Sequence, residues 1–145
     1  MNNDRYHKFI AFDGQIIDTS MPKVMAIINI TPDSFYAGSR TNCEADIIQK
    51  VNQAIDNGAT FLDIGGYSTR PNADEVSEQE EINRIRFALS IIRKHHPNIP
   101  ISIDTFRAEV AKIAVKEFNV GMINDVSGFD WDPNMLNTIV ELQVP

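Results

Sequence analysis

Four short apolar segments, each followed at once by polar and turn-forming residues, constrain the fold of this chain more than any other feature. The first, residues 24–28, leads into Asn29-Ile-Thr-Pro-Asp-Ser-Phe35. Its proline has no amide hydrogen and favours extended geometry at the preceding residue, so a strand should end here. The other three segments end at Gly65, Asp104 and Asn124. Ligands bind at the carboxyl ends of strands in parallel sheets and barrels, so these polar residues are candidates for a site.

Segments with helical periodicity separate the four apolar segments. We expect strands at about residues 23–29, 60–65, 101–104 and 121–125. We expect helices at about residues 45–57, 78–96, 106–118 and 133–142. The strands are apolar rather than alternating, which is typical of parallel sheets that are covered on both faces.

Residues with helix-capping chemistry support these helix positions. Ser77 and Glu80 have the spacing of a capping box at the start of the second helix. Thr105 can cap the third helix. Asp132 followed by Pro133 predicts an N-cap with proline at the first position of the fourth helix.

Strands and helices that alternate predict parallel pairing with right-handed crossovers. Residues 1–22 contain a hairpin signal, Asp13-Gly14 between two apolar runs, and residues 23–145 supply four βα units. A complete eight-stranded barrel typically needs about 250 residues. We therefore expect one α/β domain, residues 1–145, whose parallel (β/α) units form roughly the first half of a TIM barrel, with an N-terminal β-hairpin. An open doubly wound sheet is the alternative.

The composition excludes several classes of function. The net charge of −7 argues against a nucleic-acid partner. The sequence shows neither a signal peptide nor an apolar stretch of about 20 residues, so we expect no membrane partner. Cys43 is the single cysteine, which excludes an intramolecular disulfide and a cysteine-rich zinc site. We expect a cytoplasmic protein.

Four motifs, in order along the chain, resemble those of the dihydropteroate synthases of the pterin-binding TIM-barrel family. They are Met25-Ala-Ile-Ile-Asn-Ile-Thr-Pro-Asp-Ser-Phe35, Gly58-Ala-Thr-Phe-Leu-Asp-Ile-Gly-Gly66 with Ser68-Thr-Arg-Pro71, Ile103-Asp-Thr105, and Ile123-Asn-Asp-Val-Ser-Gly128. The resemblance covers nearly the whole chain from Val24 onward. It implies the condensation of hydroxymethyl-dihydropterin diphosphate with p-aminobenzoate, which gives dihydropteroate and pyrophosphate for folate biosynthesis, with assistance from Mg²⁺.

The resemblance also implies roles for individual residues. Asn29 would be the magnesium ligand, and Asp33 and Arg70 would be catalytic. Six residues would bind the substrates, pterin diphosphate and p-aminobenzoate: Thr31, Ser34, Thr69, Arg70, Asp104 and Asn124. The full-length enzyme would be a homodimer and a sulfonamide target.

Plainer readings of the same residues remain open. The amide of Asn29 can satisfy backbone groups at a strand end, Asp33 can stabilise a turn, and Asp104 can cap a helix. Asp63 lies inside an apolar run, so it needs a partner and is expected to give structural support. Tyr67 departs from the family, which usually has glutamate there.

The segments that complete the pterin and diphosphate pockets in the family do not occur in this sequence. We therefore expect that this chain alone is incomplete and inactive. Two other functions are alternatives: a truncated, non-catalytic fragment, and the pterin-binding domain of a methyltetrahydrofolate methyltransferase.

Overall fold

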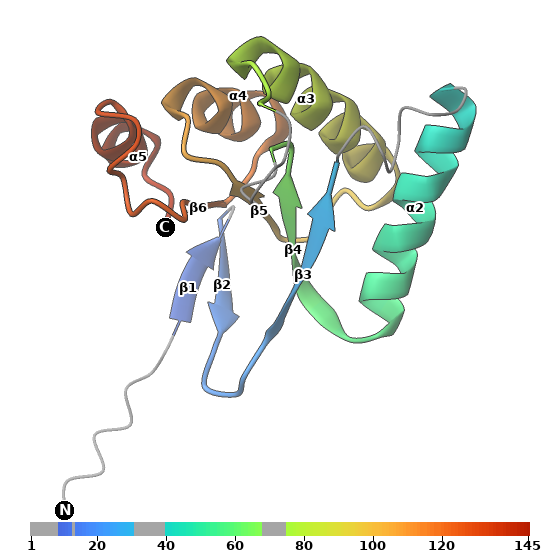
Figure 1. Ribbon diagram of the computed structural model, residues 1–145. Coiled ribbons are helices and arrows are strands. Elements are labelled where there is room, and N and C mark those ends of the chain that lie inside the picture. Colours follow the sequence, from blue (N-terminus) through green and yellow to red (C-terminus); the bar gives the residue numbers. More distant parts are fainter. Residues whose placement is uncertain (1–8, 13, 31–39, 68–74) are drawn as a thin grey trace, which may run out of the picture.

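The computed structural model describes residues 9–12, 14–30, 40–67 and 75–145, which contain two β-sheets. Strands β1 (Phe9–Phe12) and β2 (Gln15–Asp18) form the expected antiparallel hairpin, in which Phe12 pairs with Gln15. The second sheet is parallel and has the order β3-β4-β5-β6. Its strands are β3 (Val24–Asn29), β4 (Ala59–Gly65), β5 (Ile101–Asp104) and β6 (Met122–Asn124). Figure 1 shows the hairpin below the parallel strands.

Among the described residues, four helices form an arc along one side of the parallel sheet (Figure 1). They are α2 (Arg40–Asp56), α3 (Glu78–His95), α4 (Ala108–Phe118) and α5 (Met135–Leu142). Each strand of the parallel sheet is thus followed by a helix, as expected of βα units. The α/β fold expected from the sequence, with a half TIM barrel and a hairpin, is confirmed. Within the part of the chain that the structure describes, no helix is long and apolar enough to cross a lipid bilayer.

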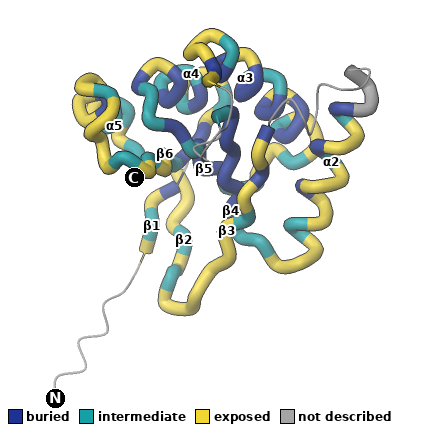
Figure 2. Tube along the Cα trace, viewed as in Figure 1, coloured by how far each residue is buried: buried dark blue, intermediate teal, exposed yellow. Residues whose placement is uncertain are grey.

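The hydrophobic core lies between the sheet and the helices. Figure 2 shows that buried residues concentrate in β4 and β5 and on the sides of α3 and α4. The strands supply side chains at every second position, including Leu62, Ile64, Ile101 and Ile103. The helices supply Ile47, Val51, Ile85, Leu89 and Val110, among others. This packing fixes the carboxyl ends of the four strands relative to one another.

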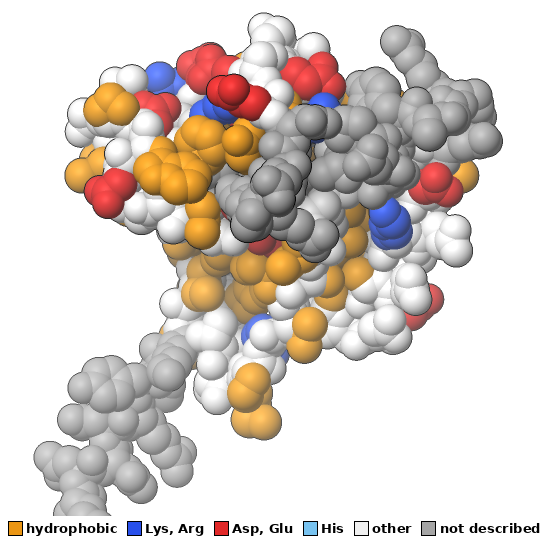
Figure 3. Space-filling view, viewed as in Figure 1, with side chains coloured by type: hydrophobic (Ala, Val, Ile, Leu, Met, Phe, Trp, Pro, Cys, Tyr) orange, Lys and Arg blue, Asp and Glu red, His pale blue; other side chains and the backbone are white. Residues whose placement is uncertain are grey.

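The opposite face of the sheet, which we call the inner face, is covered differently. Phe12 of the hairpin is buried and packs against Phe61 of β4, with ring centroids 5.6 Å apart. A Cβ atom on Gly121 would lie 2.6 Å from the Phe12 ring, so this close approach requires glycine. On β3, by contrast, Ile27 is 67% exposed. Figure 3 shows apolar side chains gathered over the strands, between the hairpin and the helices.

Three helix starts differ from the sequence prediction. Helix α2 begins at Arg40 rather than near residue 45, and buried Cys43 lies on the same face as Ile47 and Val51. Helix α4 begins at Ala108, so the prediction that Thr105 caps it is wrong.

Asp132 explains both the start of α4 and that of α5. Its Oδ2 accepts a hydrogen bond from the Ala108 amide (2.8 Å), and its Oδ1 accepts one from the Asn134 amide (2.9 Å). Helix α5 therefore begins at Met135, two residues later than predicted, and Asp132 caps the preceding helix instead. After α5 the chain returns to the sheet, where the Ile123 amide donates to the Pro145 carbonyl (3.0 Å).

Candidate functional site

The last residues of the four parallel strands form one row across the sheet. Asn29 ends β3, Gly65 ends β4, Asp104 ends β5 and Asn124 ends β6, and each pairs in register with the next. Residues in register on neighbouring parallel strands project from the same face of the sheet. We call these four residues the strand-end row. It brings one carboxylate and two amides together at the carboxyl end of the inner face.

Gly65 leaves a gap in the middle of this row. A Cβ atom at this position would lie 3.1 Å from Oδ1 of Asn29 and 3.6 Å from Oδ2 of Asp104. The side chains of its two neighbours therefore lean over the bare backbone from both sides. The absence of a Cβ atom thus lets the polar groups of Asn29 and Asp104 approach each other over Gly65.

A second row lies beneath the strand-end row on the same face, two residues earlier on each strand. It consists of Ile27, Asp63, Ser102 and Met122. Asp63 is only 3% exposed, and its Oδ2 accepts a hydrogen bond of 2.9 Å from Nδ2 of Asn124. Its Oδ1 and the Ser102 hydroxyl have no hydrogen-bond partner among the described residues. Asn124 is thus a partner for the carboxylate that the sequence placed inside an apolar run.

Electrostatics make Asp104 unusual among the carboxylates. Burial raises the pKa of Asp104 to about 6, and the negative charges of Asp63, Glu81 and Asp125 act in the same direction. The ionised form of Asp104 would therefore bind most favourably a ligand group that donates hydrogen bonds or carries a positive charge. Such a carboxylate is suited to recognising the N–H groups of a ligand.

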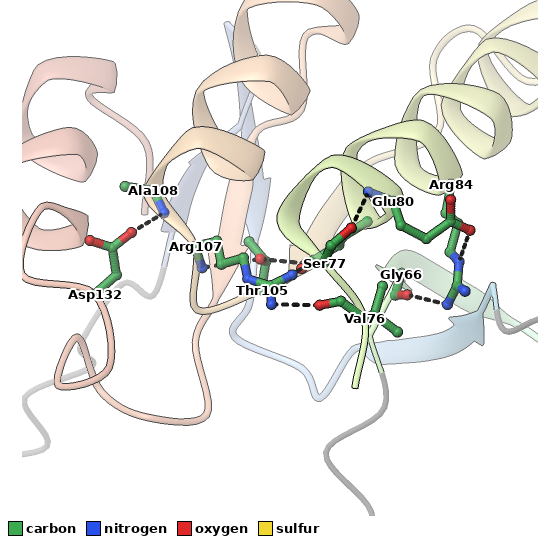
Figure 4. A network of polar contacts seen from close by, with 10 residues as sticks. Gly66, Val76, Ser77, Glu80, Arg84, Thr105, Arg107, Ala108 and Asp132 are labelled. Atoms are coloured by element: carbon green, nitrogen blue, oxygen red, sulfur yellow. Dashed lines mark hydrogen bonds and ion pairs between the residues drawn. The ribbon is translucent and has the colours of Figure 1, made fainter. Parts of the chain in front are cut away.

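A buried ion pair connects the loops that follow β4 and β5 (Figure 4). Glu81 of α3 is fully buried, accepts a hydrogen bond from the Thr105 hydroxyl (2.7 Å) and pairs with Arg107 (2.6 Å). Arg107 also donates to the carbonyl oxygen of Val76 (2.7 Å). Burial raises the pKa of Glu81, although Thr105 and Arg107 act in the opposite direction. The pair thus ties the residues after β5 to the end of the loop after β4.

The other end of the loop after β4 is held by a second arginine. Arg84 of α3 donates from Nη1 to the carbonyl oxygen of Gly66 (3.1 Å) and from Nε to Glu80 (2.9 Å). The sequence analysis missed this role for α3. For Glu81, the other member of α3 that holds this loop, a signal was present in the sequence. It lies four residues before Ile85 and therefore on the buried face of the helix, and this spacing could have identified it as a buried carboxylate that needs a partner.

Aromatic side chains flank the same loops. Tyr67, Phe106 and Trp131 follow β4, β5 and β6, and neighbouring rings contact edge to face at 5.4 and 5.1 Å between centroids. The Arg107 guanidinium lies over the rings of Tyr67 (5.3 Å) and Phe106 (5.0 Å). Tyr67, the departure from the family pattern, thus takes part in packing between loops.

The structure brings together three of the residues that the sequence analysis selected: Asn29, Asp104 and Asn124. The other selected positions lie outside the described residues: Thr31, Asp33, Ser34, Thr69 and Arg70. Among the residues that are described, no group of three or more His, Cys, Asp or Glu side chains could hold a metal ion. A cation at the strand-end row would thus depend on the Asn29 amide oxygen, water and ligand oxygens.

Comparisons with known proteins agree with this geometry. The family model for pterin binding enzymes matches residues 25–145. The chain is 47% identical over 122 residues to the folic acid synthesis protein fol1 of Pneumocystis carinii, covering 84% of this chain and 16% of that protein. It is 42% identical over 122 residues to the dihydropteroate synthase of Clostridium beijerinckii, covering 84% of this chain and 45% of that protein.

A solved structure shows the same relation in three dimensions. The dihydropteroate synthase of Xanthomonas albilineans, solved with 4-aminobenzoic acid, superposes with a TM-score of 0.82 and 36% identity. The match covers 94% of this chain and 50% of that one. The chain thus spans about half the length, or less, of these relatives. With the strand-end row in place and the family model matched over most of its length, the chain belongs to the pterin binding enzyme family.

Proposed function

We propose that this chain contributes to a dihydropteroate synthase, which joins hydroxymethyl-dihydropterin diphosphate to p-aminobenzoate and releases pyrophosphate. The observation that carries the proposal is the strand-end row, in which Asn29 and Asp104 flank the bare backbone of Gly65 and Asn124 lies beside Asp104 on the next strand. The relatives named above act in folic acid synthesis or as dihydropteroate synthases, which favours this activity over that of a methyltransferase.

The pterin ring would bind between Asp104 and Asn124. The edge of a pterin presents N–H donors next to ring acceptors, so a carboxylate and an amide can match it with hydrogen bonds. A ligand without these groups would leave the Asp104 carboxylate and the Asn124 amide without hydrogen-bond partners, which is the basis of discrimination. Gly65 would let the ring lie against the backbone.

Asn29 would hold Mg²⁺ through its amide oxygen. A hard divalent cation is commonly bound by one or two protein oxygens together with water and substrate phosphates. Oδ1 of Asn29 faces across Gly65 towards Asp104, so it fits this role without a carboxylate cluster. When bound, the metal would neutralise the diphosphate and make it a better leaving group.

Residues on the loops would complete the reaction. Arg70 would pair with the diphosphate or with the carboxylate of p-aminobenzoate through its planar guanidinium group. Thr69 would bind beside it, and Thr31, Asp33 and Ser34 would order the substrates. The aniline nitrogen would attack the methylene carbon of the pterin, so the main contribution of the protein would be to position the reactants.

The described part of the chain supplies four parallel strands, whereas a closed barrel of this kind has eight. We therefore expect the 145-residue chain assayed alone to form no dihydropteroate. The full-length enzyme would be a cytoplasmic homodimer that sulfonamides inhibit in competition with p-aminobenzoate.

The test has two parts. Titration of the chain with 6-hydroxymethylpterin, followed by NMR chemical shifts, should perturb the backbone amides of Gly65, Asp104 and Asn124. A chain extended through the family's second half should form dihydropteroate from the two substrates with Mg²⁺, and sulfonamide should inhibit it. Absence of product from the extended enzyme would refute the proposed activity.

A further inference from the structure

Asp63 holds a position that the stability of the fold does not explain. Its carboxylate is 3% exposed in the second row of the inner face, between the exposed side chain of Ile27 and the buried hydroxyl of Ser102. A buried carboxylate is costly unless it is paired, and the described residues give Asp63 a single side-chain partner, Asn124. An apolar residue of similar size would pack here without that cost. The contact with Asn124 therefore points to a functional role for Asp63.

The chemistry of this contact fixes the orientation of the Asn124 amide. An ionised carboxylate can only accept hydrogen bonds, so the amide must turn its Nδ2 towards Asp63. The bond spans 61 residues of sequence and crosses β5 on the inner face. The backbone of Asn124 is held separately, because its carbonyl oxygen accepts from the Thr105 amide at 3.0 Å. Because both the side-chain nitrogen and the backbone carbonyl of Asn124 are held by hydrogen bonds, its Oδ1 is directed away from Asp63.

We propose that Asp63 is a positioning residue, which locks the amide of Asn124 so that its oxygen, and not its nitrogen, faces the ligand. The strand-end row then presents acceptors at both Asp104 and Asn124, and it selects a ligand whose edge carries N–H donors at both points. A ligand with an acceptor opposite Asn124 would meet a second acceptor and be rejected. The ligand part of this inference rests on the proposed function, whereas the orientation of the amide does not.

The orientation can be measured in the free chain by NMR. The side-chain amide protons of Asn124, assigned with the Asn124→Asp variant, should exchange with solvent more slowly than those of exposed Asn52. Asp63→Asn should abolish this protection. The new amide at position 63 can either donate or accept, so it no longer forces the Asn124 amide into one orientation. Ser102→Ala is the matched control, since the Ser102 hydroxyl is buried in the same row and makes no hydrogen bond to Asn124, and it should leave the protection intact. Exchange at Asn124 as fast as at Asn52 in the unmodified chain would overturn the proposal.

Ligand binding supplies the second measurement, with 6-hydroxymethylpterin as the probe and chemical-shift titration to detect weak binding. Asp63→Asn should weaken binding about ten-fold, as expected when one hydrogen bond to the ligand is no longer preorganised, and Ser102→Ala should change it by less than about two-fold. The swapped variant Asp63→Asn/Asn124→Asp should recover binding, because it restores the buried contact and still presents an acceptor. Equal losses for Asp63→Asn and Ser102→Ala would overturn the positioning role. A chain extended through the family's second half that protects Asn124 but binds no pterin would refute only the proposed function.

Discussion

Replacing Asp104 by asparagine should make the fold more stable at neutral pH. The pKa of Asp104 is raised to about 6 from an ordinary value of 3.8, so the folded state favours the protonated carboxyl. The contribution of this group to stability is therefore fully present below about pH 4 and is lost as the pH rises towards 6. Asparagine keeps the size and polarity of the side chain but does not titrate.

The size of the effect follows from the shift in pKa. A shift of about 2 units corresponds to an upper limit of about 3 kcal/mol at 1.36 kcal/mol per unit. Asp104 is only half-buried, and water screens the charges around it, so we expect about 1 kcal/mol. The free energy of unfolding of Asp104→Asn, relative to that of the unmodified chain, should rise by this amount between pH 4 and pH 7.

Urea unfolding at a series of pH values from 4 to 7.5 tests this reasoning. Glu81 also has a raised pKa, but it is present in both proteins, so its effect largely cancels in the difference. Asp130→Asn, which removes the same charge from an exposed position on the loop after β6, is the control and should show no such gain. A stability difference between Asp104→Asn and the unmodified chain that does not change with pH would refute the argument.

Three further substitutions test other features of the site. Arg107→Met should destabilise the fold by about 3 kcal/mol at pH 7, because it leaves Glu81 buried without its charged partner, and urea unfolding should show a smaller loss at low pH, where the carboxyl is protonated. Gly65→Ala places a Cβ 3.1 Å from the amide oxygen of the neighbouring asparagine on β3. This substitution should lower the free energy of unfolding by about 1 kcal/mol in thermal unfolding. It should weaken pterin binding in the NMR titration by far more than this loss of stability implies. Asp132→Ala should cost about 1 kcal/mol and increase hydrogen exchange at the Ala108 amide; unchanged exchange would contradict the capping role.

The sequence was sufficient to predict the sheet and the strand-end row. Each strand is an apolar run that stops at a polar residue or a glycine, so strand ends could be located to within a residue or two, and β5 agrees at both ends. Parallel strands with helical crossovers align their carboxyl ends, so Asn29, Asp104 and Asn124 had to lie near one another. The start of α2 was missed because polar residues surround Cys43, although its spacing to Ile47 was helical.

The polar contacts that support the row could not be predicted in the same way. Glu81 pairs with Arg107 across 26 residues, and Asp63 contacts Asn124 across 61. Such contacts depend on how far each strand and helix is shifted along its neighbour, and apolar periodicity does not determine that shift. The sequence could only indicate that a carboxylate within an apolar run needs a partner.

The cap on α4 has a consequence for the order in which the chain folds. The first amide of this helix is satisfied by Asp132, a residue that leaves the ribosome after the whole of α4 and β6. During synthesis the start of α4 therefore remains frayed until the loop after β6 has formed, and its protection reports the docking of the fourth βα unit. The start of the third βα unit's helix is thus completed by a residue of the fourth unit.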